Sequence, residues 1–357
     1  MNNKKTILVR ILATVVLAAS SINVSVGASE KVSESTSGQE SLNKAIVQTK
    51  DAPVKRSFEE WKLTLKPEML KQGADPLLAD QIIESLTFIP KVIKLDRHQP
   101  EGRMSHEQYL TKVIPPWKVK RAREEYKLNQ SKLEQASEIT GVPAQYIVSL
   151  WGKETNFGTI TGNYSVPSSL ATLAYDGRRA NFFRRELMAA VKILSQGHIA
   201  LKDMKGSWAG AMGNCQFMPT SFLQYAVDAN NDGKKDIWAD KDDIFASMGN
   251  YLSRYGWDKT KSWGRQIKLT RPFSEYQIGK KHAQQLSQWQ NAGVRRMNGD
   301  DLPQVELNAY LIAPGGKTGR IYLVYPNFDI IMKWNRSHYF ATGVGYLADR
   351  IAYPRIN

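Results

Sequence analysis

Apolar residues recur at the three- and four-residue spacing of an amphipathic helix along much of the chain, and this periodicity limits the fold more than any other feature. Residues 181–195 show it clearly, because Phe183, Leu187, Val191 and Leu194 fall on one side. Prolines and glycines separate the helical stretches. Helices are predicted within residues 58–89, 118–139, 143–155, 181–195, 219–227 and 243–255. The predicted fold class is therefore mainly α.

The C-terminal part carries a different pattern. Residues 320–325 alternate weakly between apolar and polar, a Pro-Asn pair follows at Pro326, and residues 328–334 could return as a second strand. We therefore expect a small β element near the C-terminus, built as a hairpin.

The chain is long enough to bury a core without covalent help. It has 357 residues, of which 42% are hydrophobic. Cys215 is the single cysteine, so an intramolecular disulfide is excluded, and no Cys/His cluster has the spacing of a zinc site. We expect Cys215 to be a small buried hydrophobe.

The N-terminus has the order of a secretory signal. Lys4, Lys5 and Arg10 precede an apolar run over residues 11–19, and a stretch of small residues then ends at Ala28. Residues 1–28 are predicted to be a cleavable signal peptide, with an uncleaved anchor as the alternative. No cysteine lies near the cleavage site, which excludes a lipoprotein. Residues 29–56 are polar without apolar period and are predicted to be a disordered leader.

The charge of the chain indicates an acidic partner. The formal charge of +15 falls to +12 once the three cations of the signal are removed. For an exported protein, acidic cell-wall polymers or an acidic membrane surface are more available than nucleic acid, which we rank lowest. A basic protein without such a partner is the remaining alternative.

One carboxylate falls on an apolar helix face. In the predicted helix 143–155, Ile147, Leu150 and Trp151 share a side, and Glu154 follows at the same spacing. A carboxylate held against apolar groups loses hydration, so its pKa rises and it can act as a general acid near neutral pH. The alternatives are an exposed Glu or a buried Glu paired with an Arg.

Three motifs in order give this acid a context. They are WGKETNFG at 151–158, SLATLAYDGRRANFF at 169–183 and KGSWAGAMGNCQFMPTSF at 205–222, and together they resemble the B-type lytic murein transglycosylases. The resemblance covers residues 57–357, including DRHQPE at 96–101 and KWNRSHYF at 333–340. It implies a lysozyme-like helical core over about residues 130–265, with additional helical segments before it and a C-terminal part that closes the cleft.

The resemblance also implies a reaction. The substrate is the glycan strand of peptidoglycan, whose β-1,4 bond between N-acetylmuramic acid (MurNAc) and N-acetylglucosamine (GlcNAc) is cleaved without water to give 1,6-anhydroMurNAc ends. A single glutamate, here Glu154, serves as acid and then as base, and no cofactor or second carboxylate is required. The alternatives are a hydrolytic muramidase and a non-catalytic peptidoglycan-binding protein.

The matching positions carry over as substrate-binding residues. Ser207 and Gln216 resemble sugar contacts, Phe217 an apolar wall, Tyr251 and Asn335 cleft-lining residues, Tyr109 a stacking aromatic, and Arg178 and Arg179 a basic pair for muropeptide carboxylates. Tyr251 and Phe217 could equally be core aromatics. Two positions depart from the family pattern, Cys215 where a small residue is expected and Trp334 where a Tyr is common.

Residues 228–240 resemble the start of an EF-hand calcium loop. Asp228, Asn230 and Asp232 offer side-chain oxygens, Gly233 occupies the turn, and Lys234 offers its backbone carbonyl. The twelfth position is Ala239 rather than Glu, and the resemblance implies Asp242 as the last ligand of a longer loop over 228–242. We expect a structural Ca²⁺, with an acidic turn that caps a helix at Asp243 as the alternative. The predicted protein is thus a periplasmic, monomeric enzyme, with peripheral contacts to the membrane or to cell-wall proteins left open.

Overall fold

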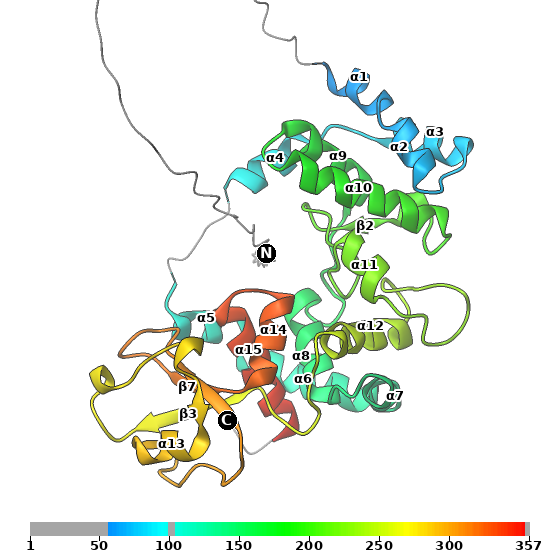
Figure 1. Ribbon diagram of the computed structural model, residues 1–357. Helices are drawn as coiled ribbons and strands as arrows, with labels where there is room; N and C mark the ends of the chain where they lie inside the picture. Colours follow the sequence, from blue (N-terminus) through cyan, green and yellow to red (C-terminus); the bar gives the residue numbers. More distant parts are fainter. Residues whose placement is uncertain (1–55, 99–103, 354–357) are drawn as a thin grey trace, which may run out of the picture.

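The computed structural model describes residues 56–98 and 104–353 (Figure 1). The predicted signal peptide and all but the last residue of the predicted leader lie outside the described residues. The helices are Phe58–Leu63 (α1), Lys66–Lys71 (α2), Pro76–Ser85 (α3), Pro90–Arg97 (α4), His106–Val113 (α5), Pro116–Leu128 (α6), Gln130–Thr140 (α7), Ala144–Thr155 (α8), Val166–Asp176 (α9), Ala180–Ser195 (α10), Pro219–Tyr225 (α11), Lys241–Arg254 (α12), Leu286–Asn291 (α13), Pro326–Trp334 (α14) and His338–Ala352 (α15). Within this part of the chain, no helix is long and apolar enough to cross a membrane.

The helices form two groups. α1, α2, α4, α9 and α10 pack together at one end of the molecule (Figure 1). α10 buries the apolar side that its sequence predicts. The second group surrounds α8, which packs against α6, α7, α12 and α15. Ile147 and Leu150 of α8 have no exposed surface, so this helix lies at the centre of the core.

The predicted helices are confirmed, with one division. The region 118–139 forms α6 and α7 instead of one helix, because the Asn129 side chain donates from Nδ2 to the Glu125 carbonyl at 2.8 Å and ends α6. Gly141 ends α7 with a φ of 71°, in the left-handed region that glycine adopts without strain. Pro143 then caps α8.

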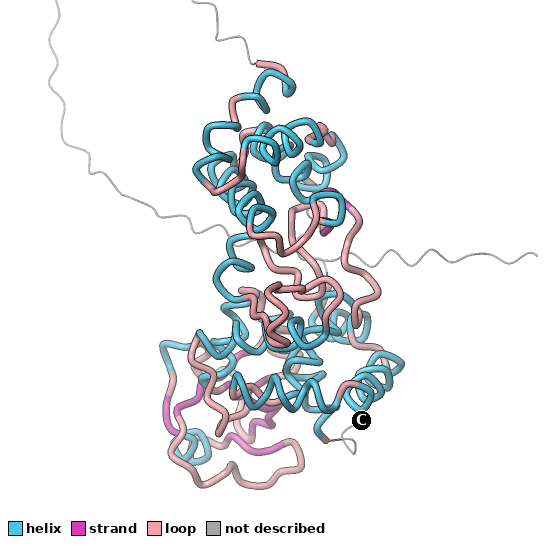
Figure 2. Tube along the Cα trace, turned by 90° about the vertical axis from the view of Figure 1, so that its right-hand side faces the viewer, coloured by secondary structure: helices cyan, strands magenta, loops and turns pink. Residues whose placement is uncertain are grey.

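The strands are Tyr164–Ser165 (β1), Lys205–Gly206 (β2), Gly264–Leu269 (β3), Gln284–Gln285 (β4), Val294–Arg296 (β5), Asn308–Ile312 (β6) and Ile321–Val324 (β7). β1 pairs with β2, and the others form an antiparallel sheet in the order β4-β6-β7-β3-β5. In its register Gly264 lies opposite Val324, which in turn lies opposite Tyr310. Figure 2 shows this sheet at the end of the molecule away from α9 and α10.

The sheet separates two apolar cores. Tyr310, Ile312, Tyr322 and Val324 face the helices, whereas the alternate residues of β6 and β7 join a smaller core with α13. The two-residue period of a strand thus places one sheet face on each core. The small β element expected near the C-terminus is present as this sheet.

The predicted hairpin partner at 328–334 is wrong. These residues belong to α14, which begins with Pro326 at its first position and buries Phe328 and Ile331 on one side. The three-residue spacing of these two side chains is a helical period, and the β6 and β3 strands pair with β7 instead. α14 and α15 therefore return to the helical core, where α15 packs on α8.

Candidate active site

Glu154 lies in the last turn of α8 with its side chain half-buried. Its carboxylate is not free in solvent, because Trp334 donates from Nε1 to Glu154 Oε1 at 2.7 Å. Burial raises the pKa of Glu154 to about 7, and this outweighs the Trp334 hydrogen bond and the charge of Lys153, which both lower it. The acid is therefore half protonated near neutral pH, and its partner is an indole rather than an Arg.

The end of α8 sets the direction of this acid. Asn156 and Phe157 both adopt positive φ values, of 52° and 59°, so the chain turns away directly after Thr155. The buried Phe157 ring folds back beneath Gly152, where an added Cβ would lie 2.6 Å from it. Glycine at position 152 is thus required for the turn that follows Glu154.

Aromatic rings surround the partner of the acid. The Trp334 ring lies 4.7 Å from that of Tyr251 and 5.4 Å from that of Phe217, measured between centroids. The Tyr251 hydroxyl donates to the Lys333 carbonyl at 2.7 Å, which ties α12 to the end of α14. Phe217 and Tyr251, both predicted to line the cleft, therefore pack against the indole that binds Glu154.

Lys153 and Tyr109 are further neighbours of Glu154, since the charge of Glu154 acts on both. The Lys153 ammonium donates from Nζ to the Tyr109 hydroxyl at 2.7 Å. Burial, and to a smaller extent the charge of Lys118, lower the pKa of Lys153 to about 7, while the charge of Glu154 opposes both. Burial raises the pKa of Tyr109, and the charge of Glu154 adds to this. Tyr109, predicted to bind substrate, is therefore close enough to Glu154 for the charge of the carboxylate to affect its pKa.

The loop 206–217 holds the next predicted residues. Ser207 is buried, and its Oγ accepts from the Ala211 amide at 3.0 Å, while Gln216 donates from Nε2 to the Thr161 carbonyl at 3.0 Å. Asn214 accepts from Trp151 Nε1 at 2.7 Å and so fastens this loop to α8. Sequence reasoning did not single out Asn214, because its partner lies 63 residues away.

Asn335 and the Arg pair make structural contacts. Asn335 Oδ1 accepts from the Ser337 amide at 3.1 Å, next to Trp334. Arg178 and Arg179 both bind the buried carboxylate of Asp96, Arg178 with Nε at 2.7 Å, and so hold α4 on the α9–α10 corner. None of the contacts described for the pair joins it to Glu154. The Arg178 side chain is 50% exposed, so it still offers donors to a ligand.

The structure also places the two residues that depart from the family pattern, Trp334 and Cys215. Trp334, noted only as a departure from the family, donates the hydrogen bond to Glu154; its position beside Asn335 was the available signal. Cys215 is fully buried, and burial raises the pKa of its thiol well above the usual range, so it is the inert hydrophobe that was expected.

The loop 228–243 requires a correction in its last position. The Asp242 carboxylate is paired with Lys132 on α7 and does not enter the loop. Asp243 enters instead: it is fully buried and accepts from the Ala229 amide at 2.7 Å and the Asp236 amide at 2.6 Å. The N-cap of α12 is Asp240, whose side chain accepts from the Asp242 and Asp243 amides. The alternative prediction, a helix cap at Asp243, is therefore wrong by three residues.

The donors of this loop are all oxygens. Carboxylates of Asp228, Asp232 and Asp243, the amide of Asn230 and the Lys234 carbonyl are the hard ligands that calcium takes, so the donor set fits that ion. Several carboxylates accept loop amides, such as that of Gly233 by Asp228 at 2.9 Å. Over residues 56–98 and 104–353, no three His, Cys, Asp or Glu side chains converge on one point, because the carboxylates of this loop accept its own backbone amides; the fit to calcium is one of donor type.

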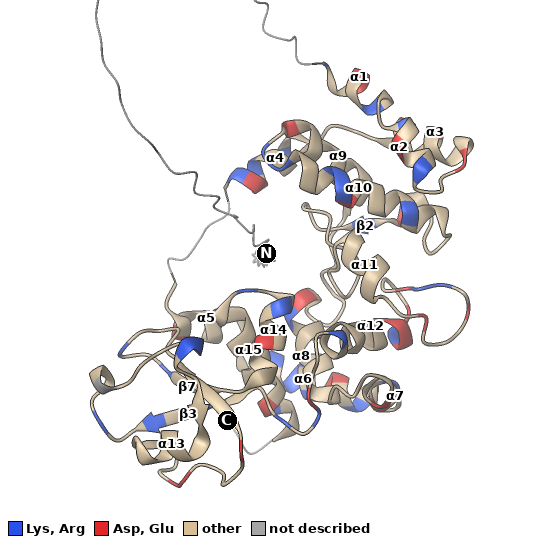
Figure 3. Ribbon diagram, viewed as in Figure 1, with Lys and Arg blue, Asp and Glu red and all other residues tan. Residues whose placement is uncertain are grey.

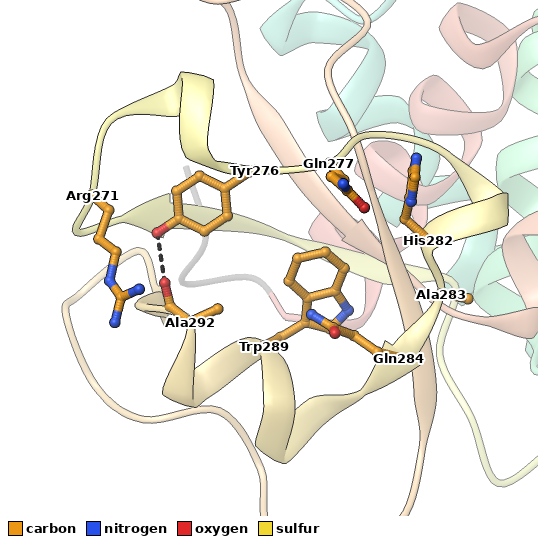
Figure 4. A pocket seen from close by; sticks show the side chains of 8 residues that line it. All are labelled: Arg271, Tyr276, Gln277, His282, Ala283, Gln284, Trp289 and Ala292. Carbon is orange, nitrogen blue, oxygen red and sulfur yellow. Dashed lines mark hydrogen bonds between the residues drawn. The ribbon is translucent and has the colours of Figure 1, made fainter.

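A separate hollow of about 340 Å³ lies in the sheet region (Figure 4). Its Tyr276 hydroxyl donates to the Ala292 carbonyl at 2.9 Å, and Trp289 donates from Nε1 to the Ala309 carbonyl at 2.8 Å. These polar groups already hold α13 against the sheet. The residues predicted for the active site do not line this hollow.

A helical core that presents the half-buried Glu154 beside a wall of aromatic side chains is typical of an enzyme of the lysozyme-like class. Residues 57–349 match the family model described as Transglycosylase SLT domain, and the chain therefore belongs to the lytic transglycosylases, enzymes that act on peptidoglycan. The predicted fold class and family are confirmed.

Similar proteins agree with this assignment. Membrane-bound lytic murein transglycosylase B of Escherichia coli (strain K12) is 32% identical over 303 residues, which are 80% of this chain and 81% of that protein. SltB3 from Pseudomonas aeruginosa, solved with NAG-NAM-pentapeptide, is 37% identical with a TM-score of 0.79, covering 84% of this chain and 80% of that one. The Escherichia coli lytic transglycosylase Slt35 in complex with calcium is 29% identical with a TM-score of 0.70, covering 84% and 94%.

Proposed function

We propose that Glu154 cleaves the MurNAc–GlcNAc β-1,4 bond of peptidoglycan without water, acting first as the acid and then as the base. The observation that carries this proposal is the Glu154 carboxyl itself, half-buried, with a pKa of about 7 and a hydrogen bond from Trp334. A group with this pKa can both give and take a proton near neutral pH.

The proposed reaction has two proton transfers. Glu154 protonates the bridge oxygen, so the bond to MurNAc C1 breaks and GlcNAc leaves with a hydroxyl. The carboxylate that results is stabilised by the Trp334 N–H and by the Lys153 charge. It then takes the proton of the MurNAc C6 hydroxyl while that oxygen bonds to C1, which yields the 1,6-anhydro ring and restores the acid.

Two observations support a single-acid mechanism. The charge that acts on Glu154 is that of Lys153, and no carboxylate of the described residues is among the influences on its pKa. The substrate acetamido group then stabilises the cation in place of a second carboxylate. SltB3, the 37% identical relative, has been solved with NAG-anhNAM-pentapeptide, which carries the proposed type of product end.

The neighbouring residues receive roles as parts of this proposal. Phe217 and Tyr251 form the apolar wall beside Trp334, and Tyr109 stacks on a sugar. Ser207, Gln216 and Asn335 have polar groups left after their structural hydrogen bonds and orient the acetamido groups. Arg178 offers its exposed edge to stem-peptide carboxylates, while Arg179 holds Asp96.

Digestion of purified sacculi tests the proposed reaction. Wild-type enzyme should release muropeptides with anhydro ends, which are lighter by one water than hydrolysed ends in mass spectra. Glu154→Gln, which keeps the shape of the side chain, should release none. Hydrolysed ends from the wild type would identify a muramidase, and unchanged digestion by E154Q would contradict the role of Glu154.

We propose that the enzyme is a periplasmic monomer exported by the signal at residues 1–28. Lys and Arg residues lie scattered over the helices and the sheet (Figure 3). A nucleic-acid-binding protein typically gathers them in one basic patch or stripe. The scattered charge therefore supports attraction to an acidic cell wall. N-terminal sequencing of protein from the periplasm should begin after Ala28. An unprocessed N-terminus would indicate an anchor instead.

We also propose that one Ca²⁺ binds the loop 228–243 through Asp228, Asn230, Asp232, the Lys234 carbonyl and Asp243. The oxygen donor set supports this, as does the calcium complex of the relative Slt35. The ion would neutralise the buried Asp243, whose pKa is raised by burial and by the charges of Asp240 and Asp228. Its role is structural, because no step of the proposed reaction needs a metal.

A matched pair of variants tests the calcium proposal. With Ca²⁺ at about 100 times its dissociation constant, the wild type should gain about 2.7 kcal/mol and melt several degrees higher. Asp243→Asn should lose this gain, whereas Asp242→Asn should keep it because Asp242 binds Lys132. Equal melting temperatures of the wild type with Ca²⁺ and with a chelator would contradict the proposal.

A further inference from the structure

Lys153 is an unusual neighbour for an acid that must give up a proton. It lies next to Glu154 in the chain, and its long side chain is partly buried instead of reaching solvent. Its Nζ donates to the Tyr109 hydroxyl at 2.7 Å and lies 4.7 Å from the Tyr109 ring centroid and 5.2 Å from that of Phe340. Two aromatic faces and a hydroxyl therefore receive this ammonium.

The space for the ammonium is built into α15. A Cβ added at Gly343 would lie 3.3 Å from Lys153 Nζ, so glycine at this position leaves room for the cation. The titratable groups around Lys153 are Tyr109 from α5, Lys118 from α6 and Glu154 from its own helix, and Tyr339 of α15 contacts the Tyr109 ring at 5.3 Å. Among the described residues whose charge acts on Lys153, Glu154 is the one carboxylate.

We propose that Lys153 is a positioning residue of the transglycosylase reaction: it fixes the Tyr109 phenol against the glycan and supplies the positive charge that favours ionised Glu154 after the first proton transfer. This inference rests on the proposed function of Glu154. Positioning of Tyr109 acts on substrate binding and is measured by KM. The charge acts on the proton transfers and is measured by the pH profile.

The geometry separates the two effects. Removing the Tyr109 hydroxyl breaks the contact that positions the ring but leaves the cation in place. Replacing Lys153 with Met fills the same space without charge, so both effects are lost while the packing against Phe340 and Gly343 is kept. Because the Lys153 charge lowers the pKa of Glu154, its loss raises that pKa, and the acid form persists to higher pH.

The test compares pH profiles of kcat/KM on a defined glycan. Lys153→Met should raise KM, move the alkaline limb up by roughly half to one pH unit and lower kcat by up to about tenfold, since one pKa unit corresponds to a factor of ten. Tyr109→Phe should raise KM with the limb unmoved, and Lys153→Arg, which stays charged across this pH range, should leave the limb at or below its wild-type position. Thermal melting checks folding, and Lys153→Gln replaces the Met variant if that one does not fold.

The outcomes are distinct. A Lys153→Met enzyme with wild-type KM and a wild-type alkaline limb overturns the inference while Glu154→Gln remains inactive. If Glu154→Gln itself still forms anhydro ends, the proposed function fails, whatever Lys153 does.

Discussion

At the scale of single residues, the Trp334 indole is the group that most directly controls Glu154. Its N–H lowers the pKa of the acid and stabilises the carboxylate formed in the first step. Trp334→Phe should therefore raise the pKa of Glu154 above about 7, shift the alkaline limb of kcat/KM upward and lower kcat. A hydrogen bond to a charged group is worth about 1.5–3 kcal/mol, which is roughly 10- to 100-fold in rate.

Trp334→Tyr is the control, because it keeps an aromatic ring and a donor. It should retain more activity than the Phe variant at every pH. Steady-state kinetics from pH 5 to 9 compare the three enzymes. Equal profiles for the Phe and wild-type enzymes would show that the hydrogen bond has no part in the reaction.

The same two residues show what sequence can reveal at this scale. Glu154 could be predicted, because its apolar neighbours lie within one helix and the motif is continuous. The Trp334 hydrogen bond spans 180 positions, and only the folded arrangement of α8 and α14 creates it. Asp243 was missed as a loop residue for a smaller reason. It lies next to Asp242 in the chain, and the contacts with the backbone amides of Ala229 and Asp236 decide which of the two carboxylates turns inward.

At the scale of elements, the end of α8 is fixed by packing rather than by helix propensity. Alanine at position 152 would favour a helix by about 1 kcal/mol. The new methyl group would lie 2.6 Å from the Phe157 ring, however, and overpacking costs about 1–3 kcal/mol. Gly152→Ala should therefore destabilise the protein and reduce activity, because the displaced turn follows Glu154. Urea unfolding and sacculus digestion measure the two effects.

A second substitution identifies the cause. Phe157→Leu shortens the ring that the methyl meets, so the G152A/F157L double variant should be more stable than the sum of the single changes predicts. Additive effects would mean that the Phe157 contact is not what Gly152 relieves.

Helices and strands could be predicted from the sequence where a long periodic pattern lies within the element itself. In α10 the apolar residues recur at helical spacing over 16 residues, so the helix can be predicted without knowing what it packs against. α14 has nine residues that begin with a Pro-Asn pair, and so short an apolar stretch satisfies a strand pattern and a helix pattern alike. Burial of Phe328 and Ile331 against the helices decides between them.

At the scale of the whole molecule, the sheet lies between two cores, and its order was beyond prediction. β4 and β6 pair across more than 20 residues, and β7 lies between β6 and β3 with both faces covered, so no clean alternation of polar and apolar residues marks it. Strand pairing of this kind is decided by long-range packing.

This arrangement predicts that the two cores respond separately to damage. Leu311 faces the smaller core with α13 and Val324 faces the helices, and both are fully buried. Leu311→Ala should cost about 2–5 kcal/mol and speed hydrogen exchange in α13 and β5 while α8 stays protected. Val324→Ala, on a neighbouring strand but the opposite face, should speed exchange in the helices around α8 and lower the temperature at which activity is lost. If both variants accelerate exchange equally in α8 and α13, the molecule unfolds as one unit and the sheet couples the cores. If they differ, the sheet insulates Glu154 and its partners from changes beyond it.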